Sequence, residues 1–327
     1  MLRLALSLLL PALIATACSS SQPAPQPAVD RTEATPPGFR VAFLGDQGLG
    51  PNPRAVLTLV HDEGAQMLLE LGDFDYADDP NAWDAQIDDV LGPAFPVFAV
   101  VGNHDLKRWD VYRQRLKQRL ARVPGARCDG EYGVNAACSY RGLFFVLSGA
   151  GTRGSDHAAY LRDQLAQSSS IWRVCAWHKN QRALQLGSKD DATGWDVYEA
   201  CRTGSAIVAN AHEHSYERTK TLRDFKSRRV DPQWRTPDRL RVGGGSTFAF
   251  VAGLGGESIR NQARCHPTTP PYGCNLEWAH VYTSDQDATY GALFIDFNVD
   301  GDPHRARGYF KNIRGETVDR FEIVAQD

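Results

Sequence analysis

The sequence predicts an α/β fold of four layers, an α-β-β-α sandwich in which two mixed sheets pack face to face with helices outside. From Phe39 onward, short apolar segments alternate with segments of helical periodicity, a pattern typical of largely parallel sheets. After His214, apolar segments follow one another without helical segments between them, which indicates additional antiparallel strands. We find no internal repeat and no second boundary, so residues 39–327 are expected to form one domain.

In the first half of this domain, segments with strand patterns alternate with segments with helix patterns. Val56, Leu57 and Val60 have the spacing of a single buried helix face. The run 97–101 is apolar at successive positions, as expected for a strand covered on both faces. The expected order is strand 40–44, helix 54–63, strand 67–71, helix 81–91, strand 97–101, helix 109–122, strand 143–147, helix 157–167, strand 171–177, helix 193–202 and strand 206–210.

The second half of the domain is predicted to contain strands alone. Its apolar segments are short and are separated by segments rich in Gly, Pro, Asn and Asp, which favour turns. Strands are expected at 248–252, 280–283, 293–299, 305–310 and 317–324.

Residues 1–38 are not expected to belong to the fold. Arg3 and the apolar stretch 4–17 resemble a signal peptide, and the stretch is shorter than the roughly 20 residues that span a bilayer. It ends in Ala-Thr-Ala-Cys, which resembles a bacterial lipobox and implies a lipid anchor on Cys18 at the periplasmic face of the envelope or the cell surface. Ordinary cleavage, giving a soluble periplasmic or secreted protein, is the alternative. Residues 19–38, rich in Ser, Pro and Gln, are expected to form a flexible tether.

The charge and cysteine content narrow the class of protein. A net charge of −3 and a pI near 6.3 argue against a nucleic-acid-binding surface. The oligomeric state is not indicated. Without Cys18, six of the seven cysteines remain, and an even number in an exported chain favours disulfides. Among the pairings that six cysteines allow, the spacing favours Cys128–Cys138 and Cys265–Cys274, and Cys175–Cys201 would then be the third. A cysteine zinc site is disfavoured, because the chain has no Cys-x-x-Cys pair.

Polar side chains follow the predicted strands at the points where the strands end. They are Asp46 in Gly-Asp at 45–46, Asp73 and Tyr76 in Gly-Asp-Phe-Asp-Tyr at 72–76, Asn103 and His104 in Gly-Asn-His-Asp at 102–105, His178 after 171–177, and His212 and His214 in Ala-His-Glu-His at 211–214. The carboxyl ends of parallel strands meet at one edge of a sheet, so we expect these side chains to gather there. Their mixture of carboxylate, phenol, amide and imidazole groups suits a pair of hard or borderline metal ions.

These motifs resemble those of the calcineurin-like metallophosphoesterases. The Asp73-x-x-Tyr76 spacing and the run His-Glu-His-Ser-Tyr-Glu-Arg at 212–218 resemble the purple acid phosphatase branch. The resemblance implies ferric iron at one position, and zinc, manganese or ferrous iron at a second. It implies a first position formed by Asp46, Asp73, Tyr76 and His214, and a second formed by Asp73, Asn103, His178 and His212. It also implies that His104 lies beside the bound phosphate, where it acts as a catalytic residue.

The chain departs from the family pattern at two positions. Ala211 stands where family members usually have glycine, and His178 is followed by Lys179-Asn180 instead of a residue and then proline. We hypothesise that Lys179 and Arg182 contact a phosphate of the substrate.

Taken singly, the motif residues have plainer interpretations, namely a turn aspartate, a packed aromatic ring or a core histidine. Only their joint occurrence predicts an enzyme. We expect a metal-dependent phosphoric ester hydrolase that acts on small phosphorylated substrates, phosphomonoesters above all, through hydroxide activated at a binuclear centre. The alternatives are a phosphodiesterase or nucleotide-cleaving enzyme of the same fold, and a surface lipoprotein that binds phosphate or a partner without turnover.

Overall fold

The computed structural model describes residue 2 and residues 33–326. The expected signal peptide, the lipidation site Cys18 and the tether as far as residue 32 therefore lie almost entirely outside the described residues. The last residues before the domain contact it, because Thr35 is buried and its carbonyl accepts a hydrogen bond of 2.7 Å from the Asn298 side chain. None of the helices in the described residues has the length and apolar character needed to cross a membrane.

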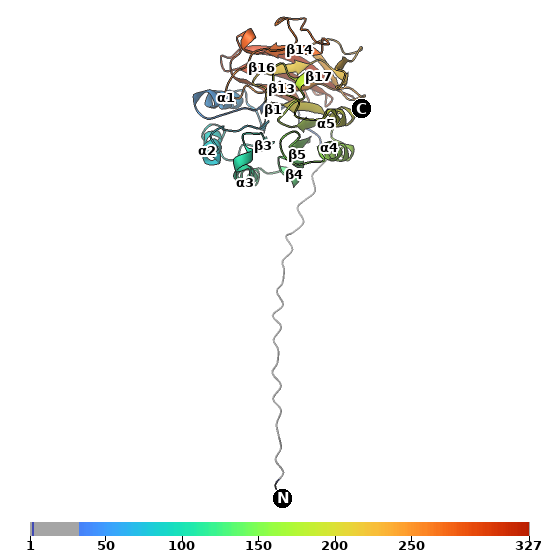
Figure 1. Ribbon diagram of the computed structural model, residues 1–327. Helices are drawn as coiled ribbons and strands as arrows, with labels where there is room; N and C mark the ends of the chain where they lie inside the picture. The colour runs from blue at the N-terminus through green and yellow to red at the C-terminus, as the bar shows by residue number, and fades with distance from the viewer. Residues whose placement is uncertain (1, 3–32, 327) are drawn as a thin grey trace.

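Two large sheets form the centre of the molecule (Figure 1). The seven-stranded sheet has the order β12-β17-β16-β15-β1-β2-β3 and is built from β1 (Phe39–Leu44), β2 (Met67–Glu70), β3 (Val97–Ala99), β12 (Arg239–Val242), β15 (Gly291–Phe297), β16 (Arg305–Asn312) and β17 (Thr317–Ala325). The eight-stranded sheet has the order β14-β9-β13-β8-β7-β6-β5-β4 and is built from β4 (Arg127–Glu131), β5 (Asn135–Tyr140), β6 (Leu143–Ser148), β7 (Arg173–Ala176), β8 (Ile207–Asn210), β9 (Tyr216–Thr219), β13 (Ala249–Ala252) and β14 (Trp278–Tyr282). A separate hairpin pairs β10 (Leu222–Asp224) with β11 (Arg229–Val230).

Each sheet has a parallel part and an antiparallel part. β1, β2 and β3 are parallel neighbours in one sheet, and β6, β7, β8 and β13 are parallel neighbours in the other. β15, β16 and β17 continue the first sheet beyond β1, and each of them is antiparallel to the strand before it in the sheet. The carboxyl ends of parallel strands lie at one edge of a sheet, so the residues that follow these strands share a rim.

Helices cover the outer faces beside the parallel strands. α1 (Pro51–Asp62), α2 (Pro80–Leu91) and α3 (Trp109–Leu120) lie on the side of β1 to β3, and α4 (His157–Ala166) and α5 (Trp195–Thr203) lie on the side of β6 to β8 (Figure 1). α2 shows how the local sequence starts such a helix. Pro80 occupies its first turn, the Asp79 side chain accepts hydrogen bonds from the amides of Asn81 and Ala82, and Trp83 is buried. The predicted α-β-β-α class is confirmed.

The core between the sheets is rich in aromatic side chains. Phe43 of β1 meets Phe250 of β13 edge to face at a centroid distance of 5.3 Å, and Phe98 of β3 meets Phe145 of β6 at 4.7 Å. These rings come from different sheets and are fully buried. Contacts of this kind bury large apolar areas and fix how the two sheets face each other, and therefore how their rims align.

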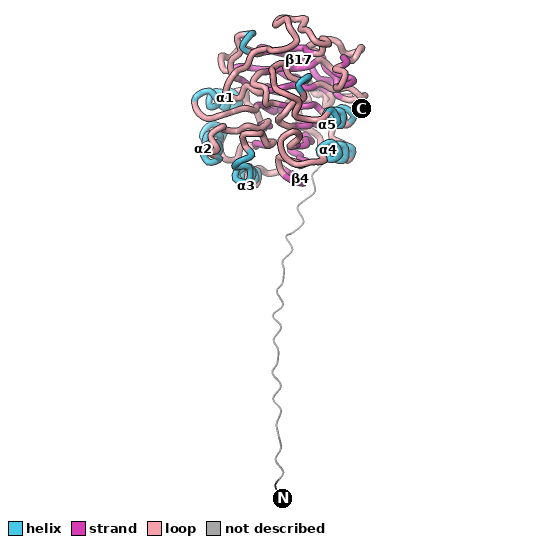
Figure 2. The backbone as a smooth tube through the Cα atoms, viewed as in Figure 1, coloured by secondary structure: helices cyan, strands magenta, loops and turns pink. Residues whose placement is uncertain are grey.

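The sequence pattern does not predict β4, β5 or the strands from β9 to β12. β4 is an edge strand, and its residues are all at least partly exposed. β9 reads Tyr-Glu-Arg-Thr, yet all four residues are buried. Ser215 donates to Glu217, Arg218 donates to Asp319, and the Thr219 hydroxyl accepts from the amide of Ala249. The chain between β8 and β14 is otherwise largely loop and turn (Figure 2).

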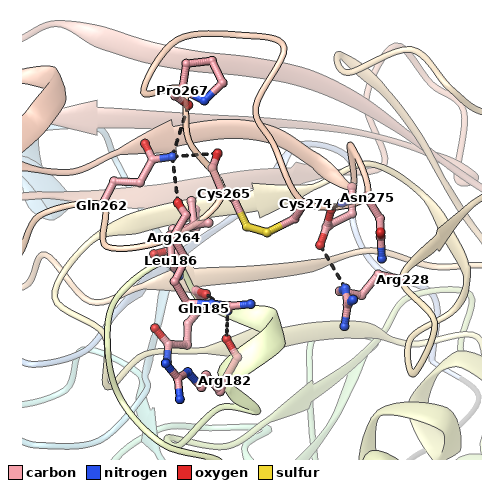
Figure 3. Close-up of a disulfide and its surroundings, with 12 residues drawn as sticks. Arg182, Gln185, Leu186, Arg228, Gln262, Arg264, Cys265, Pro267, Cys274 and Asn275 are labelled. Carbon is pink, nitrogen blue, oxygen red and sulfur yellow. Dashed lines mark hydrogen bonds and ion pairs between the residues drawn. A yellow bond between two sulfur atoms is a disulfide. The ribbon is translucent and has the colours of Figure 1, made fainter.

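The three predicted disulfides are present, which confirms the predicted pairing. Cys128–Cys138 joins the neighbouring strands β4 and β5, where the two residues are paired in register. Cys175–Cys201 joins β7 to α5, so it ties a central strand to the helix that covers it. Cys265–Cys274 closes a loop between β13 and β14 (Figure 3). The bridges restrict the unfolded chain, which stabilises the folded one.

Candidate metal centre

The predicted ligands and His104 follow the ends of five parallel strands. Asp46 follows β1, Asp73 and Tyr76 follow β2, Asn103 and His104 follow β3, His178 follows β7, and His212 and His214 follow β8. Four of these residues have a left-handed backbone, with φ of 55° at Asp46, 58° at Asp73, 56° at Tyr76 and 71° at His212. Non-glycine residues adopt this conformation rarely, and such strain concentrates at functional sites.

Tyr76 lies at the centre of one cluster. Its Oη is 2.8 Å from Asp46 Oδ1, 3.3 Å from Asp73 Oδ2 and 3.2 Å from His214 Nε2. His214 Nε2 is also 3.1 Å from Asp46 Oδ1. The structure therefore brings together all four side chains expected at the first ion position, with one potential ligand atom of each facing the others.

A second cluster adjoins the first through Asp73. His178 Nε2 lies 3.1 Å from Asp73 Oδ2 and 3.1 Å from His212 Nδ1. One ligand atom of each of these three residues lies within 4.8 Å of the others. Asn103 Oδ1 is buried and has no hydrogen-bond partner. A buried carbonyl oxygen without a partner is unfavourable, and it is the atom with which an asparagine binds a cation.

Glycines allow the strand ends to approach one another. A Cβ atom on Gly102 would lie 2.1 Å from Asp73 N and 2.2 Å from Asp73 Oδ1, so only glycine fits against that carboxylate. A Cβ atom on Gly45 would lie 2.5 Å from the Cβ of Ala211. The methyl group of Ala211, where the family pattern has glycine, is thus accommodated because Gly45 faces it without a side chain.

Backbone contacts fix the orientation of the ligand side chains. Asp105 Oδ2 accepts hydrogen bonds from the amides of Asp73 at 3.0 Å and Gly102 at 2.6 Å, which ties the loops after β2 and β3 together. His178 Nδ1 lies 2.8 Å from the Leu71 carbonyl, so a ring proton is placed there and Nε2 is turned toward Asp73 and His212. His214 Nδ1 contacts the Ser258 hydroxyl in the same manner.

Carboxylates and imidazoles in the cluster shift each other's pKa values. Burial opposes ionised carboxylates, yet the facing His214 lowers the pKa of Asp46 to about 2, and His178 holds the pKa of Asp73 below its usual value. These carboxylates raise the pKa of His178 to about 9 against the effect of burial. Burial and the neighbouring His178 lower the pKa of His212 to about 2, so its ring is neutral and retains a lone pair.

Tyr76 differs from the other members of the cluster in its proton affinity. Burial, together with the negative charges of Asp46 and Asp73, raises the pKa of its phenol well above the usual value. Beside carboxylates, a phenolate is favoured only if a strongly positive group compensates for the added negative charge.

His104 stands at the open side of the cluster. Its ring is exposed and lies 4.5 Å, centroid to centroid, from the ring of Tyr76. Its backbone N–H donates to Asp73 Oδ1 at 2.8 Å, which fixes the residue at the rim. His104 is thus close to the predicted ligands and accessible to a ligand from solvent.

Two further predicted residues, Lys179 and Arg182, lie in the segment after β7, and of the two only Lys179 acts electrostatically on His212. Lys179 follows His178 directly and is half-buried. The side chain of Arg182 is exposed, and its backbone belongs to the short helix η2 (Arg182–Leu184). Sequence reasoning missed Lys189, whose ammonium contacts His212, because the loop that carries it has no motif spacing. It also missed Asp105, although this residue belongs to the Gly-Asn-His-Asp motif.

Comparisons with known proteins identify the family of the chain. A family model described as calcineurin-like phosphoesterase matches residues 39–216. The chain belongs to this family. The resemblance seen in its motifs is thereby confirmed, and metal-dependent phosphoesterase chemistry on phosphorylated substrates is supported. The family typically binds two metal ions.

Two solved structures share the fold. One is GAP50, the anchor in the inner membrane complex of Plasmodium, with a TM-score of 0.58 and 12% identity over 88% of this chain and 89% of that chain. The other is PhoD, with a TM-score of 0.55 and 14% identity over 88% of this chain and 67% of that chain. No curated protein matches the sequence.

Proposed function

We propose that this protein hydrolyses phosphate esters, with phosphomonoesters preferred, at a two-ion centre of purple acid phosphatase type. The position of Asp73 is the observation that carries the proposal. Its Oδ2 atom is 3.3 Å from Tyr76 Oη in one cluster and 3.1 Å from His178 Nε2 in the other. A carboxylate shared in this way suits two ions held about 3.5–4 Å apart.

The donor atoms of the two clusters fit different ions. Asp46, Asp73, Tyr76 and His214 would hold the first ion, and Asp73, Asn103, His178 and His212 the second. The first set includes a phenol with a raised pKa, which ionises most readily beside a trivalent cation, so we assign ferric iron to it. The second set has two imidazoles and the buried, unpartnered oxygen of Asn103, which suit zinc, manganese or ferrous iron.

The roles of the protein groups follow from their positions. Bound ions supply an acidified water as nucleophile and offset the charge of the phosphoryl group. His104, exposed at the rim and fixed through its backbone to Asp73, is placed to give a proton to the leaving oxygen. Asp105 keeps the loops after β2 and β3 together, so the ligands from both loops remain in position.

The decisive experiment compares Asp73→Asn with wild-type protein on a chromogenic phosphomonoester. We expect kcat to fall by about 10³-fold or more, because the shared ligand contributes several kcal/mol through the ions. Asp110→Asn is the matched control, because Asp110 is an exposed aspartate on α3. Unchanged turnover in Asp73→Asn would exclude the proposed centre. Assaying a phosphodiester in parallel tests the ester preference.

Metal analysis and a visible spectrum of the purified protein test the ion assignment. An absorption band from phenolate bound to iron supports ferric iron beside Tyr76, and this band should be lost in Tyr76→Phe. A colourless active protein with zinc or manganese at both positions would contradict the assignment and leave the hydrolytic function in place.

A non-catalytic role is the second candidate. It is raised by the shared fold with a protein described as an anchor, although that likeness has 12% identity. The full set of predicted ligands and the exposed His104 favour catalysis. Binding of inorganic phosphate without hydrolysis of any ester would support the second candidate.

We also propose export and anchoring from residues 1–18, with a lipid on Cys18 and a tether over residues 19–38 that leads to the domain at 39–327. In a bacterial host, the wild-type chain should fractionate with membranes, and Cys18→Ser should not be lipidated. Intact mass measurement of the mature protein distinguishes the two forms. A mature wild-type protein without lipid would contradict the anchor.

A further inference from the structure

Lys189 lies inside the candidate centre, although no motif includes it. Its Nζ atom is 3.0 Å from His212 Nδ1, and it also donates to the carbonyl oxygen of His212. The side chain is half-buried. It forms no ion pair with any carboxylate of the residues that the structure describes. The carboxylates of Asp46, Glu213 and Asp73 act on it only from beyond ion-pair distance. Lysine is seldom buried without a close negative partner, so this ammonium is suited to an anion that enters the centre.

The loop that carries Lys189 is anchored at several points. The Gln185 side chain donates to the carbonyl of Lys189 at 2.7 Å. Arg264, which directly precedes Cys265 of the third disulfide, donates from its guanidinium to the carbonyls of Arg182 and Gln185 (Figure 3).

Backbone bonds continue this anchoring. The amides of Ala263 and Arg264 donate to the Leu186 carbonyl at 2.8 Å and 3.1 Å. Because the backbone around residues 182–186 is held in this way, we expect the lysine side chain to move while the loop keeps its position.

The contact of Lys189 with His212 involves the nitrogen that would bind an ion. His212 Nδ1 is the atom that faces His178 Nε2 at 3.1 Å, so under the proposed function it is the ligand atom for the second ion. One imidazole lone pair cannot accept an ammonium proton and coordinate a metal at the same time. The ammonium therefore has to leave Nδ1 when the ion binds.

We propose that Lys189 is a substrate-binding cation of this centre. Its ammonium leaves His212 Nδ1 when the second ion binds and pairs with a phosphoryl oxygen of the substrate. The inference rests on the proposed function, and it adds a contact from a residue that the sequence motifs do not mark. A lysine ammonium binds phosphate as a point charge and needs no bidentate geometry, so a movement of the side chain alone is sufficient.

Lys189→Met tests the inference, because methionine keeps an unbranched side chain and removes the charge. Zn²⁺ is titrated into the full chain after removal of metal by chelation, and inorganic phosphate is then titrated into the ion-loaded protein, both by calorimetry. We expect the weaker Zn²⁺ site to bind about tenfold tighter, because a competing cation is gone. We expect phosphate to bind about tenfold more weakly, because a charge-assisted contact is lost.

The opposite signs of the two changes distinguish a substrate-binding lysine from a structural one. If Lys189→Met binds both Zn²⁺ and phosphate more weakly than wild type does, the lysine serves to hold the loop and the inference is wrong. It is also wrong if phosphate affinity is unchanged, or if Lys179→Met loses more phosphate affinity than Lys189→Met does. Lys189→Arg, which keeps the charge, should retain most of the phosphate affinity.

Lys226→Met is the control for loss of a positive charge, and neither constant should change. Lys226 is exposed on the β10–β11 hairpin, which packs on α5 through Phe225 and Tyr198. If the wild-type chain binds Zn²⁺ and phosphate with the expected Lys189 dependence but hydrolyses no ester, the proposed function fails and the inference stands.

Discussion

At the scale of single residues, the two oxygens of Asp73 have separate contacts. Oδ1 accepts the backbone N–H of His104 at 2.8 Å, and Oδ2 faces Tyr76 and His178. The carboxylate therefore links the candidate ligands to the candidate acid without a change of rotamer. Its own backbone is left-handed, with φ of 58°, and Asp105 accepts the hydrogen bond of its amide. The hydrogen bond to the buried carboxylate of Asp105 thus helps to hold the strained backbone of Asp73 in place.

His104→Gln tests the assignment of the general acid. We expect kcat on a phosphomonoester to fall about 10²–10⁴-fold, the range of general acid catalysis. Metal content should be unchanged, because His104 is not a predicted ligand. His61→Gln is the matched control, since His61 is an exposed histidine on α1. A loss of bound metal in His104→Gln would argue against the assignment and indicate a structural role.

At the scale of elements, loops from different strands are joined by a few buried polar groups. Asp105 accepts three backbone hydrogen bonds, from Gly102 at 2.6 Å, Asp73 at 3.0 Å and Phe74 at 2.9 Å. β7, which precedes His178, is joined to α5 by a disulfide between two fully buried cysteines, Cys175 and Cys201. Asp105 thus holds the loops after β2 and β3 together, and the disulfide holds α5 against β7.

Asp105→Asn should weaken the rim, because the amide group of asparagine turns a donor toward a backbone N–H. We expect about 1–3 kcal/mol lower free energy of unfolding and about 10–100-fold weaker metal binding. Denaturant unfolding and Zn²⁺ titration measure the two effects. Equal metal affinity in variant and wild type would show that the loops keep their positions without this acceptor.

Replacing Cys175 and Cys201 together by alanine should lower the free energy of unfolding by about 3 kcal/mol, because the unfolded chain gains freedom over the loop that the bridge closes. Guanidinium unfolding of the double variant measures the change. The difference between variant and wild type should shrink under reducing conditions, because the wild-type protein then loses the same bridge. A wild-type stability that is insensitive to complete reduction would contradict this account.

At the scale of the whole molecule, a buried ion pair crosses from one sheet to the other. Arg218 of β9 in the eight-stranded sheet binds Asp319 of β17 in the seven-stranded sheet, with Nε to Oδ2 at 2.7 Å and Nη2 to Oδ1 at 2.9 Å. The Tyr216 hydroxyl donates to the same carboxylate, and the guanidinium stacks 4.1 Å from the ring centroid of Phe321. Removing one partner would leave an unpaired buried charge.

Asp319→Asn should therefore lower the free energy of unfolding by about 3–5 kcal/mol at neutral pH. Burial opposes the charge, but Arg218 holds the pKa of Asp319 below its ordinary 3.8. A carboxyl with a lowered folded pKa stabilises the fold above its unfolded pKa and loses this contribution as the pH falls through the folded value. The difference between wild type and variant should shrink below pH 3.8. An equal difference at pH 7 and at low pH would contradict this.

The parallel half of the molecule could be predicted from the sequence because its signals are local. Apolar periodicity marks strands and helices within a few residues, and the motif residues stand where those strands end. The order of the motifs along the chain therefore gave the family, the fold class and the set of side chains that meet around Asp73. Two of the disulfide pairings followed from short spacings, and the third joined the two cysteines that remained.

Only the tertiary structure decided the features that depend on distant partners. The sequence indicates the antiparallel strands but does not divide them between the two sheets. β9 is hidden from pattern analysis because its buried Arg218 is paired with a residue 101 positions away. Lys189 follows no motif, and only the folded loop brings it to His212. In each case the stabilising contact is formed by residues far apart in sequence, so no local pattern of hydrophobicity or spacing encodes it.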